Sequence, residues 1–275
     1  MISCYCAVYG RVRLLEEAIE SFHRQTWKGE KELVIVNDHR GQELRYEHPE
    51  VTIINVPRRF HSLGEKWNAA ISLCKGDLLT PWDDDDIHLP WFLETYVDRL
   101  GASFYFRPIG AWLWQAGGQP LLAFNAPYHS QCIFSRNCFD LIQGYPVGRH
   151  VPEDTTFEQN RIMRGVPSVN CLMSIREYAY IYRWKWDWNN SDGWTGDPAR
   201  NDKDVPTGRI DLVPTWRKDY EAIIRKSWSR PGFIDPTQLL GNQQNVEVLC
   251  GKGRDHCREQ QAEVVTSDDR QVEIV

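Results

Sequence analysis

The stretch Pro81-Trp82-Asp83-Asp84-Asp85-Asp86-Ile87-His88-Leu89-Pro90 carries four consecutive carboxylates. It lies between an apolar, strand-like segment, residues 77–82, and a helix-like segment that begins at Pro90. Like charges this close repel one another unless a cation, water or protonation relieves them. An acidic helix N-terminus would explain one or two of the aspartates, but not all four. Ligands bind at the carboxyl ends of strands in open α/β sheets, and carboxylate oxygens suit Mg²⁺, Mn²⁺ and Ca²⁺. We therefore predict a site for a hard divalent cation here.

The segments before this cluster alternate between strand and helix patterns. Apolar runs predict strands at 2–8, 32–36, 51–56 and 77–82, and amphipathic stripes predict helices at 14–22 and 62–73. Ser62 and Glu65 form a capping box at the start of the second helix. This α/β alternation predicts a mainly parallel sheet flanked by helices, with Asp38 and the aspartate cluster at the same sheet edge.

Shorter apolar runs follow residue 100. Residues 103–106, 111–115 and 121–124 indicate a hairpin or meander, 168–175 and 180–188 are strand-like, and helices are expected at 137–142, from Glu153 onward and at 216–228. We expect residues 1–100 to form the first half of one domain, 101–230 its mixed second half, and 231–275 an irregular C-terminal extension.

The composition is that of a soluble globular protein, with 41% hydrophobic and 25% charged residues in a chain of 275. No apolar run approaches the roughly 20 residues of a membrane span. The N-terminus lacks the features of a secretion signal, so a cytoplasmic location is expected. The net charge of −6 gives no general attraction to nucleic acid. Cys250, His256 and Cys257 resemble half of a zinc site, but no second ligand pair accompanies them, so a structural role is favoured.

Several motifs follow one another in a fixed order. In chain order they are Val34-Ile35-Val36-Asn37-Asp38, Leu63-Gly64-Glu65-Lys66-Trp67-Asn68, Lys75-Gly76-Asp77-Leu78-Leu79, the aspartate cluster, Gly144-Tyr145-Pro146 with Glu153-Asp154, and Tyr182-Arg183-Trp184. This ordered set resembles the family 2 glycosyltransferases and covers residues 1–195. The resemblance implies a GT-A fold, which has a Rossmann-like, mainly parallel sheet and a mixed acceptor-side half. Neither a P-loop nor a Gly-x-Gly-x-x-Gly turn is present, which argues against P-loop NTPases and dinucleotide-binding dehydrogenases.

The resemblance implies a nucleotide-sugar donor, usually a UDP-sugar, bound across the carboxyl edge of the sheet. It assigns Asp38 to the base and places Gly64, Lys66 and Asn68 near the nucleotide. A turn-forming Asn-Asp pair would also explain Asp38, and an ordinary helix face would explain Lys66. Where the family often carries arginine before the asparagine, this chain has Trp67.

The aspartate cluster matches the family's Asp-x-Asp motif, with Asp83 and Asp85 at its ends. The resemblance implies that Asp85 is the direct metal ligand and that Asp83 contacts both metal and donor. It implies that Asp84 contacts the ribose or the donor, and it leaves Asp86 to cap the following helix. Bound Mn²⁺ or Mg²⁺ would neutralise charge as the nucleoside diphosphate leaves.

The pair Glu153-Asp154 matches the acidic pair of the family, in which the aspartate is the general base. A hydroxyl is a poor nucleophile until a carboxylate takes its proton, and direct displacement at the anomeric carbon then inverts configuration. The resemblance therefore implies Asp154 as catalytic base, with Glu153 beside it. From the residues alone, an acidic pair stabilised by the helix dipole explains both equally well.

Aromatic and charged side chains alternate along residues 182–188, so a strand would place the aromatic residues on one face. We expect Trp184, Trp186 and Arg183 to contact the acceptor; a buried aromatic ridge is the alternative. Members often place a histidine before a serine nearby, whereas this chain has Asn189-Asn190-Ser191. The expected acceptor is a saccharide or glycan, and a hydroxymethylated base in DNA is the alternative. A non-catalytic nucleotide-sugar-binding protein is a hypothesis of another class.

Overall fold

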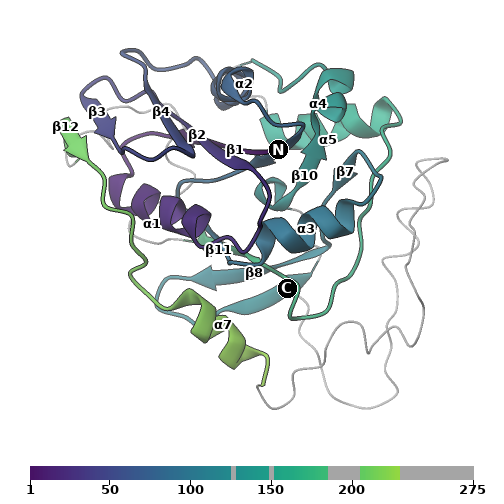
Figure 1. Cartoon of the computed structure of the whole chain (residues 1–275). Coiled ribbons are helices and arrows are strands. Elements are labelled where there is room, and N and C mark those ends of the chain that lie inside the picture. Colours follow the sequence, from purple (N-terminus) through teal and green to yellow (C-terminus); the bar gives the residue numbers. More distant parts are fainter. Residues whose placement is uncertain (125–127, 149–151, 185–204, 230–275) are drawn as a thin grey trace, which may run out of the picture.

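The computed structural model describes residues 1–124, 128–148, 152–184 and 205–229, with a six-stranded sheet of order β4-β2-β1-β5-β10-β7 at its centre (Figure 1). Strands β1 (Ile2–Val8), β2 (Lys31–Asn37), β4 (Val51–Asn55) and β5 (Leu78–Pro81) pair in parallel. Strands β10 (Ile133–Ser135) and β7 (Tyr105–Phe106) extend the sheet in antiparallel pairings. The predicted mainly parallel α/β sheet is confirmed, and both predicted halves of the domain contribute strands to it.

Helices cover both faces of this sheet (Figure 1). On one side lie α2 (Leu63–Leu73), α4 (Arg136–Ile142) and α5 (Glu153–Met163), and on the other lie α1 (Val12–His23) and α3 (Phe92–Leu100). Successive side chains of a strand point to opposite faces. Accordingly, Cys4 and Cys6 of β1 join the core that contains Leu15, whereas Tyr5 packs in the core that contains Trp67.

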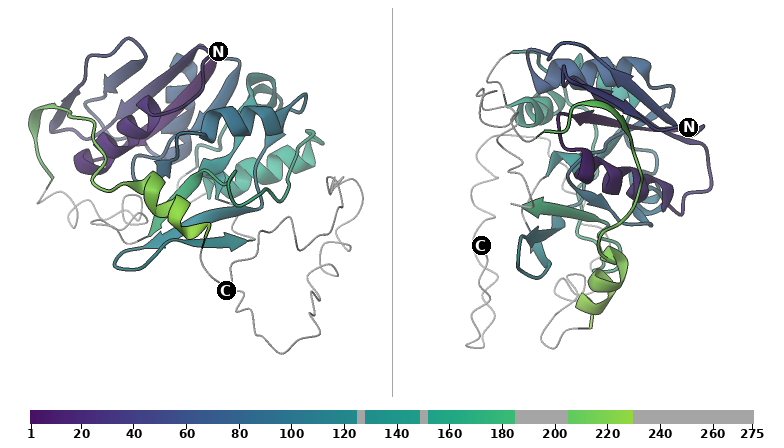
Figure 2. Two further views of the ribbon diagram at one scale, coloured as in Figure 1. Left: turned by 60° about the horizontal axis from the view of Figure 1, so that its bottom comes forward. Right: turned by 90° about the vertical axis from the view of Figure 1, so that its left-hand side faces the viewer.

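A second sheet has the order β6-β11-β8-β9. Strands β8 (Gly110–Gln115) and β9 (Leu121–Phe124) form an antiparallel hairpin, as predicted. Strand β11 (Tyr180–Trp184) pairs in parallel with β8 and antiparallel with the short β6 (Ile87–His88). Because β5 ends at Pro81 and β6 begins at Ile87, the aspartate cluster joins the two sheets. Figure 2 shows the second sheet below α1 and α3.

Two small elements complete the described chain. Strand β3 (Gln42–Arg45) pairs in parallel with β12 (Gly208–Asp211). Helix α7 (Tyr220–Ser227) begins four residues later than the predicted start at Trp216, because the Asp219 side chain accepts a hydrogen bond from the backbone N–H of Ala222 and caps the helix there. None of the helices in the described part of the chain is long and apolar enough to cross a membrane.

The structure differs from the sequence-based expectation in one segment after residue 165, and the predicted C-terminal extension is not among the described residues. The strand predicted at 168–175 is not formed in this fully described segment, where Val169 makes an isolated bridge to Phe106. The predicted extension at 231–275, with Cys250, His256 and Cys257, lies outside the described residues.

Candidate active site

The aspartate cluster lies at the carboxyl end of β5 and forms the turn into β6. Carboxylate oxygens of Asp83, Asp85 and Asp86 lie within 4.8 Å of one another. Asp85 and Asp86 are buried, and Asp83 is half-buried. Three oxygen ligands this close together suit Mg²⁺ or Mn²⁺. The residues present therefore fit the divalent cation that the sequence predicts.

Arg11 contacts this cluster from the end of the neighbouring strand β1. Its Nη2 lies 2.5 Å from Asp84 Oδ1, and its Nη1 lies 2.5 Å from Asp85 Oδ2. Gly10, whose φ is +76°, turns the chain between β1 and Arg11, and glycine adopts this conformation at little cost. No sequence motif marked Arg11, although its position directly after the first strand puts it on the same sheet edge as the cluster. Asp84, expected to contact the donor, is paired with Arg11 in this structure.

Asp83 is linked to the short helix η1 (His129–Gln131). The hydroxyl of Ser130 donates a hydrogen bond to the carboxylate of Asp83. The neighbouring His129 contacts the Tyr145 hydroxyl at 2.5 Å through Nε2, and its Nδ1 lies 3.4 Å from Glu158 on α5. The sequence singled out neither Ser130 nor His129, because no local pattern marks a contact that the fold makes across 47 residues.

Asp86 is held by strand β11 instead of capping a helix. Its carboxylate accepts hydrogen bonds from the Tyr180 hydroxyl and, at 2.8 Å, from the backbone N–H of Arg183. The prediction that Asp86 caps the following helix is wrong, because residues 87–88 form β6 and α3 begins only at Phe92. Asp86 thus joins Asp83 and Asp85 as a third candidate metal ligand.

Burial and mutual repulsion raise the pKa values of Asp83, Asp84 and Asp86. Burial, followed by the charge of Asp85, raises the pKa of Asp83 to about 6. Burial also raises the pKa of Asp84 to about 7, against the opposing effect of Arg11. The pKa of Asp86 is raised well above its usual value by burial and by the charges of Asp85 and Asp83. The ionised cluster is therefore unfavourable without a cation.

Arg183 lies inside the protein and not on a surface that faces an acceptor. Its side chain is 0% exposed, with Nη1 lying 2.5 Å from Glu17 on α1 and 3.1 Å from the Tyr220 hydroxyl on α7. Its Nε donates to the backbone carbonyl of Asp85 at 2.5 Å. The prediction that Arg183 contacts the acceptor is therefore corrected: the charged face of β11 packs against α1 and α7, and Arg183 braces the aspartate turn.

Asp38 and Lys66 form a buried ion pair at the carboxyl ends of β1 and β2. Lys66 Nζ lies 2.5 Å from Asp38 Oδ1 and donates to the backbone carbonyl of Val8 at 2.6 Å. Asp38 Oδ2 accepts from the backbone N–H of Phe60 at 2.9 Å. Both side chains are 1% exposed or less. Lys66 is thus part of the arrangement that orients Asp38, and does not lie on the ordinary helix face considered in the sequence analysis.

Gly64 and Asn68 of α2 contact the loop Gly144-Tyr145-Pro146. The Asn68 side-chain amide donates to the Tyr145 carbonyl and accepts from the Tyr145 backbone N–H, both at 2.9 Å. A Cβ on Gly64 would lie 2.0 Å from the Pro146 carbonyl oxygen. These two predicted nucleotide contacts therefore position the loop that precedes α5.

Glu153 and Asp154 form the first turn of α5, as predicted. Both are half-buried, and Asp154 Oδ1 accepts from the backbone N–H of Thr155 at 2.6 Å. Burial raises the pKa of Glu153, with the charge of His129 opposing it, and the same His129 charge lowers the pKa of Asp83 against burial. The charge of His129 in η1 therefore acts on both Glu153 and Asp83.

The predicted acceptor contact Trp186 and the side chain of Trp184 lie outside the described residues. Tyr182, the first aromatic residue of the alternating segment, stacks on Tyr128 with ring centroids 4.2 Å apart.

Residues 3–105 match the family described as Glycosyl transferase family 2. The matched segment includes Asp38, Lys66 and the whole aspartate cluster. A comparison with curated proteins found no match. The match confirms the predicted resemblance over residues 3–105.

Solved structures share the fold at low sequence identity. TarS from S. aureus is 14% identical over 66% of this chain and 36% of that one, with a TM-score of 0.51. S. aureus TarS 1–349 in complex with UDP-GlcNAc is 13% identical over 68% of this chain and 60% of that one, with a TM-score of 0.52. This chain thus spans about a third of the first and three fifths of the second, and the likeness shows the GT-A fold alone.

Proposed function

We propose that the chain is a metal-dependent, inverting glycosyltransferase that moves a sugar from a nucleotide-sugar, most simply a UDP-sugar, to a hydroxyl group of a saccharide or glycan. The observation that carries the proposal is the grouping of Asp83, Asp85 and Asp86 at the carboxyl edge of the sheet. The family match of residues 3–105 supports the reaction class. TarS 1–349 was crystallised with UDP and with UDP-GlcNAc, which supports a UDP-linked donor for a chain of the same fold.

The aspartate cluster provides the electrostatic part of this reaction. A divalent cation held by Asp83, Asp85 and Asp86 would neutralise the charge that develops on the leaving diphosphate. Arg11 balances the charge of Asp84 and Asp85, and Arg183 fixes the backbone of the turn from behind. The ligands are thereby held in place before a donor binds, so little reorganisation is needed during the reaction.

The ion pair of Asp38 and Lys66 supports donor binding at the same edge. We assign Asp38 to the nucleotide base, with Lys66 as the residue that orients its carboxylate. Gly64 and Asn68 act indirectly, because they hold the loop at 144–146. In this proposal Asp84 acts by holding Arg11, and no direct contact between Asp84 and the donor is required.

Asp154 supplies the base. Its position on the first turn of α5 leaves the carboxylate half-buried next to Glu153. In the proposed reaction Asp154 takes the proton of the acceptor hydroxyl as its oxygen attacks the anomeric carbon from the face opposite the leaving diphosphate. The bond to the diphosphate breaks as the new bond forms, so configuration at this carbon is inverted.

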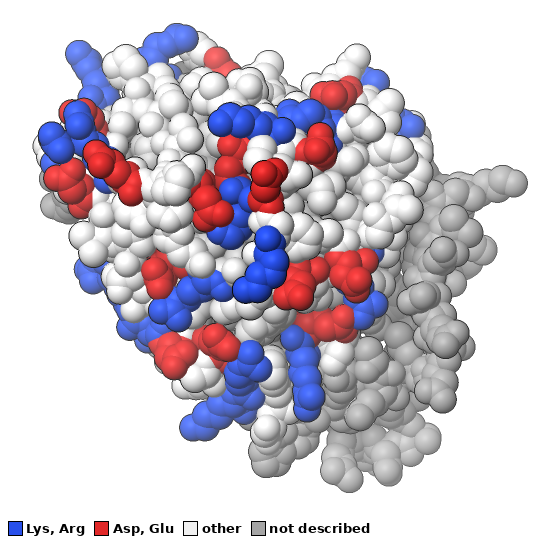
Figure 3. Space-filling view, in the orientation of Figure 1, with Lys and Arg blue, Asp and Glu red and all other residues white. Residues whose placement is uncertain are grey.

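The face seen in Figure 3 bears on the acceptor. Acidic and basic side chains are interspersed there, so this face offers no continuous basic surface for a DNA backbone. A neutral saccharide requires no such surface.

The test is a panel of nucleotide-sugars with Mn²⁺, offered to glycans and to hydroxymethylated DNA and followed by mass spectrometry. We expect a glycan product that is heavier than the unmodified acceptor by the mass of one sugar residue. Asp154→Asn should abolish transfer while leaving donor affinity nearly unchanged, and Asp140→Asn, an exposed change on α4, should affect neither. Product on DNA alone would refute the proposed acceptor, and donor binding without transfer to any acceptor would favour a binding protein.

A further inference from the structure

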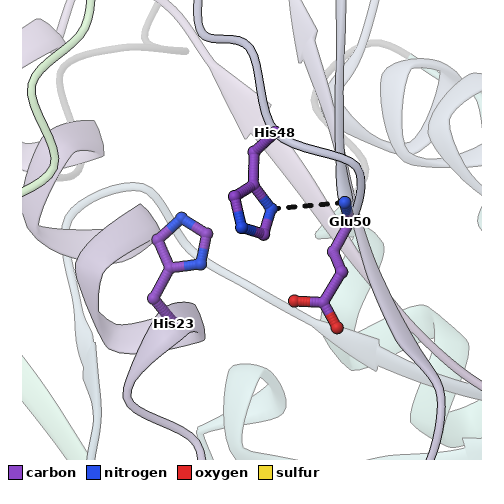
Figure 4. A group of neighbouring side chains, drawn as sticks. All are labelled: His23, His48 and Glu50. Carbon is purple, nitrogen blue, oxygen red and sulfur yellow. Dashed lines mark hydrogen bonds between the residues drawn. The ribbon is translucent and has the colours of Figure 1, made fainter.

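We propose that His23, His48 and Glu50 form a second, separate metal site that binds Zn²⁺ through three side chains. One potential ligand atom from each of these residues lies within 4.8 Å of the other two. Figure 4 shows the two imidazole rings side by side, with the carboxylate of Glu50 near them. Two imidazoles and one carboxylate are a ligand set typical of zinc, unlike the all-oxygen aspartate cluster.

This group lies far from the proposed reaction in the topology of the fold. His23 is the last residue of α1, and His48 and Glu50 directly precede β4. They therefore stand at the amino ends of the parallel strands, whereas the aspartate cluster follows the carboxyl end of β5. A metal ion here would connect α1 to the β3–β4 segment without contacting the donor.

The contacts of His23 leave one nitrogen for a metal ion. Its Nε2 lies 3.0 Å from the Tyr46 hydroxyl. When Nε2 carries the proton and donates to Tyr46, Nδ1 is unprotonated and can bind a cation. Metal-bound histidines commonly donate their other ring N–H to an oxygen in this way, which fixes the ring and its tautomer. The ring of His48 packs 4.3 Å from that of His23, centroid to centroid.

The backbone holds His48 and Glu50 in a fixed turn. The N–H of Val51 donates to the His48 carbonyl at 3.1 Å, and the N–H of Leu33 donates to the Glu50 carbonyl at 2.8 Å. His48 Nδ1 accepts from the Glu50 N–H at 3.2 Å, so Nε2 is the nitrogen left for metal. Coordination of a metal ion at Nε2 moves the ring proton to Nδ1, which can then no longer accept from the Glu50 N–H. The hydrogen bond lost in this way is the longest of these three.

The ligand atoms need only small movements to close on an ion. A tetrahedral zinc ion with bonds of about 2.0–2.2 Å holds its ligands roughly 3.4 Å apart. The present separations of at most 4.8 Å can close by side-chain rotation, because all three residues are only half-buried. Water would complete the coordination.

Lys31 competes with the metal ion for Glu50. Its Nζ lies 2.8 Å from Glu50 Oε2 and also 4.1 Å from the centre of the Phe22 ring. The second carboxylate oxygen, Oε1, is left for zinc, but the ammonium charge opposes a second cation nearby. The proposal therefore requires that Lys31→Gln strengthen zinc binding, whereas loss of a ligand weakens it.

The experiment is isothermal titration calorimetry of the full chain with Zn²⁺. Saturating Mg²⁺ is present to occupy the aspartate cluster, and a Cys250→Ser, Cys257→Ser background removes the other zinc-binding candidates. His48→Ala should weaken zinc binding by more than the roughly 10–100-fold that loss of an outer-shell partner costs. His61→Ala, a change at an exposed histidine outside the group, should leave it unchanged. Glu50→Gln gives a second, milder ligand change in case His48→Ala fails to fold.

Two further measurements separate a site from loose binding to histidine. Tyr46→Phe removes only the oxygen that orients His23, and should weaken zinc binding about 10-fold. Zinc should raise the melting temperature of the parent protein but not of His48→Ala, because a ligand bound only to the folded state stabilises that state. Equal zinc affinity in the parent, His48→Ala and Glu50→Gln proteins would overturn the proposal, whatever the outcome of the glycosyltransferase assays.

Discussion

Replacement of Arg183 by methionine should destabilise the protein strongly. The guanidinium is fully buried and pairs with Glu17, itself 2% exposed, at 2.5 Å. Removal of one partner of a buried ion pair costs about 3–5 kcal/mol, because the other charge stays buried without compensation. Glu17 retains hydrogen bonds from the Tyr220 hydroxyl at 2.8 Å and the Arg217 backbone N–H at 2.9 Å. We therefore expect a loss near the lower limit, about 3 kcal/mol, which lowers the melting temperature by roughly 6–12 °C in a chain of this size.

The assay is equilibrium unfolding in urea, with a double-mutant cycle. Arg183→Met, Glu17→Gln and the double variant are compared with the parent protein. Since Glu17→Gln removes the unpaired charge, the double variant should lose less stability than the sum of the single changes, by about 0.5–3 kcal/mol. Arg209→Met is the matched control, because that side chain is 59% exposed and should change stability by less than about 0.5 kcal/mol.

The same variant decides between the two roles considered for Arg183. A bracing role predicts lost stability and reduced turnover, because Arg183 Nε supports the Asp85 carbonyl in the metal-binding turn. A role in acceptor binding predicts unchanged stability and a raised acceptor KM. If Arg183→Met unfolds within about 0.5 kcal/mol of the parent protein, the argument from burial is refuted.

Two other changes test separate parts of the structure. Gly64→Ala should lower the free energy of unfolding by about 1–3 kcal/mol and reduce transfer, because its Cβ would lie 2.0 Å from a backbone oxygen of the loop at 144–146. Gly118→Ala is the control, since the atom nearest to its Cβ would lie at 3.4 Å. Equal unfolding midpoints for the two variants would contradict this reasoning. Although burial opposes ionisation, the hydrogen bond from His129 lowers the pKa of Glu158 to about 2. A pKa lowered by folding stabilises the protein above the unfolded value of about 4.5, so this stability should disappear as pH falls from 4.5 toward 2. Glu158→Gln should lose about 3 kcal/mol at pH 7 and show a shallower decline in acid, as measured by urea unfolding at several pH values.

Local patterns in the sequence were sufficient to predict the elements that carry the site. The Ser62 cap of α2 forms as expected, with its hydroxyl accepting from the Glu65 backbone N–H at 3.1 Å, while the Glu65 carboxylate accepts from the His61 N–H, one residue before the cap, at 2.9 Å. The apolar run before the aspartates is β5, and the acidic pair opens α5. In each case the signal lies within a few residues, where periodicity and capping chemistry act.

The contacts that orient the site could not be predicted in the same way. Arg11 and Asp84 are 73 residues apart, and Tyr180 and Asp86 are 94 apart, so only the folded sheet brings them together. The error at Arg183 has a different cause. Alternation along a strand tells which residues share a face, but it does not tell whether that face meets water or, as here, packs against two helices.

The most direct test of the central claim is the metal dependence of nucleotide binding in Asp85→Asn. In the parent protein, Mn²⁺ should strengthen UDP binding measured by calorimetry, because the ion joins the diphosphate to the aspartate cluster. In Asp85→Asn the Mn²⁺ effect should disappear while metal-free UDP binding persists, and Asp98→Asn, an exposed change on α3, should behave as the parent protein does. An undiminished effect of Mn²⁺ on UDP affinity in Asp85→Asn would contradict the assignment of this cluster as the metal site.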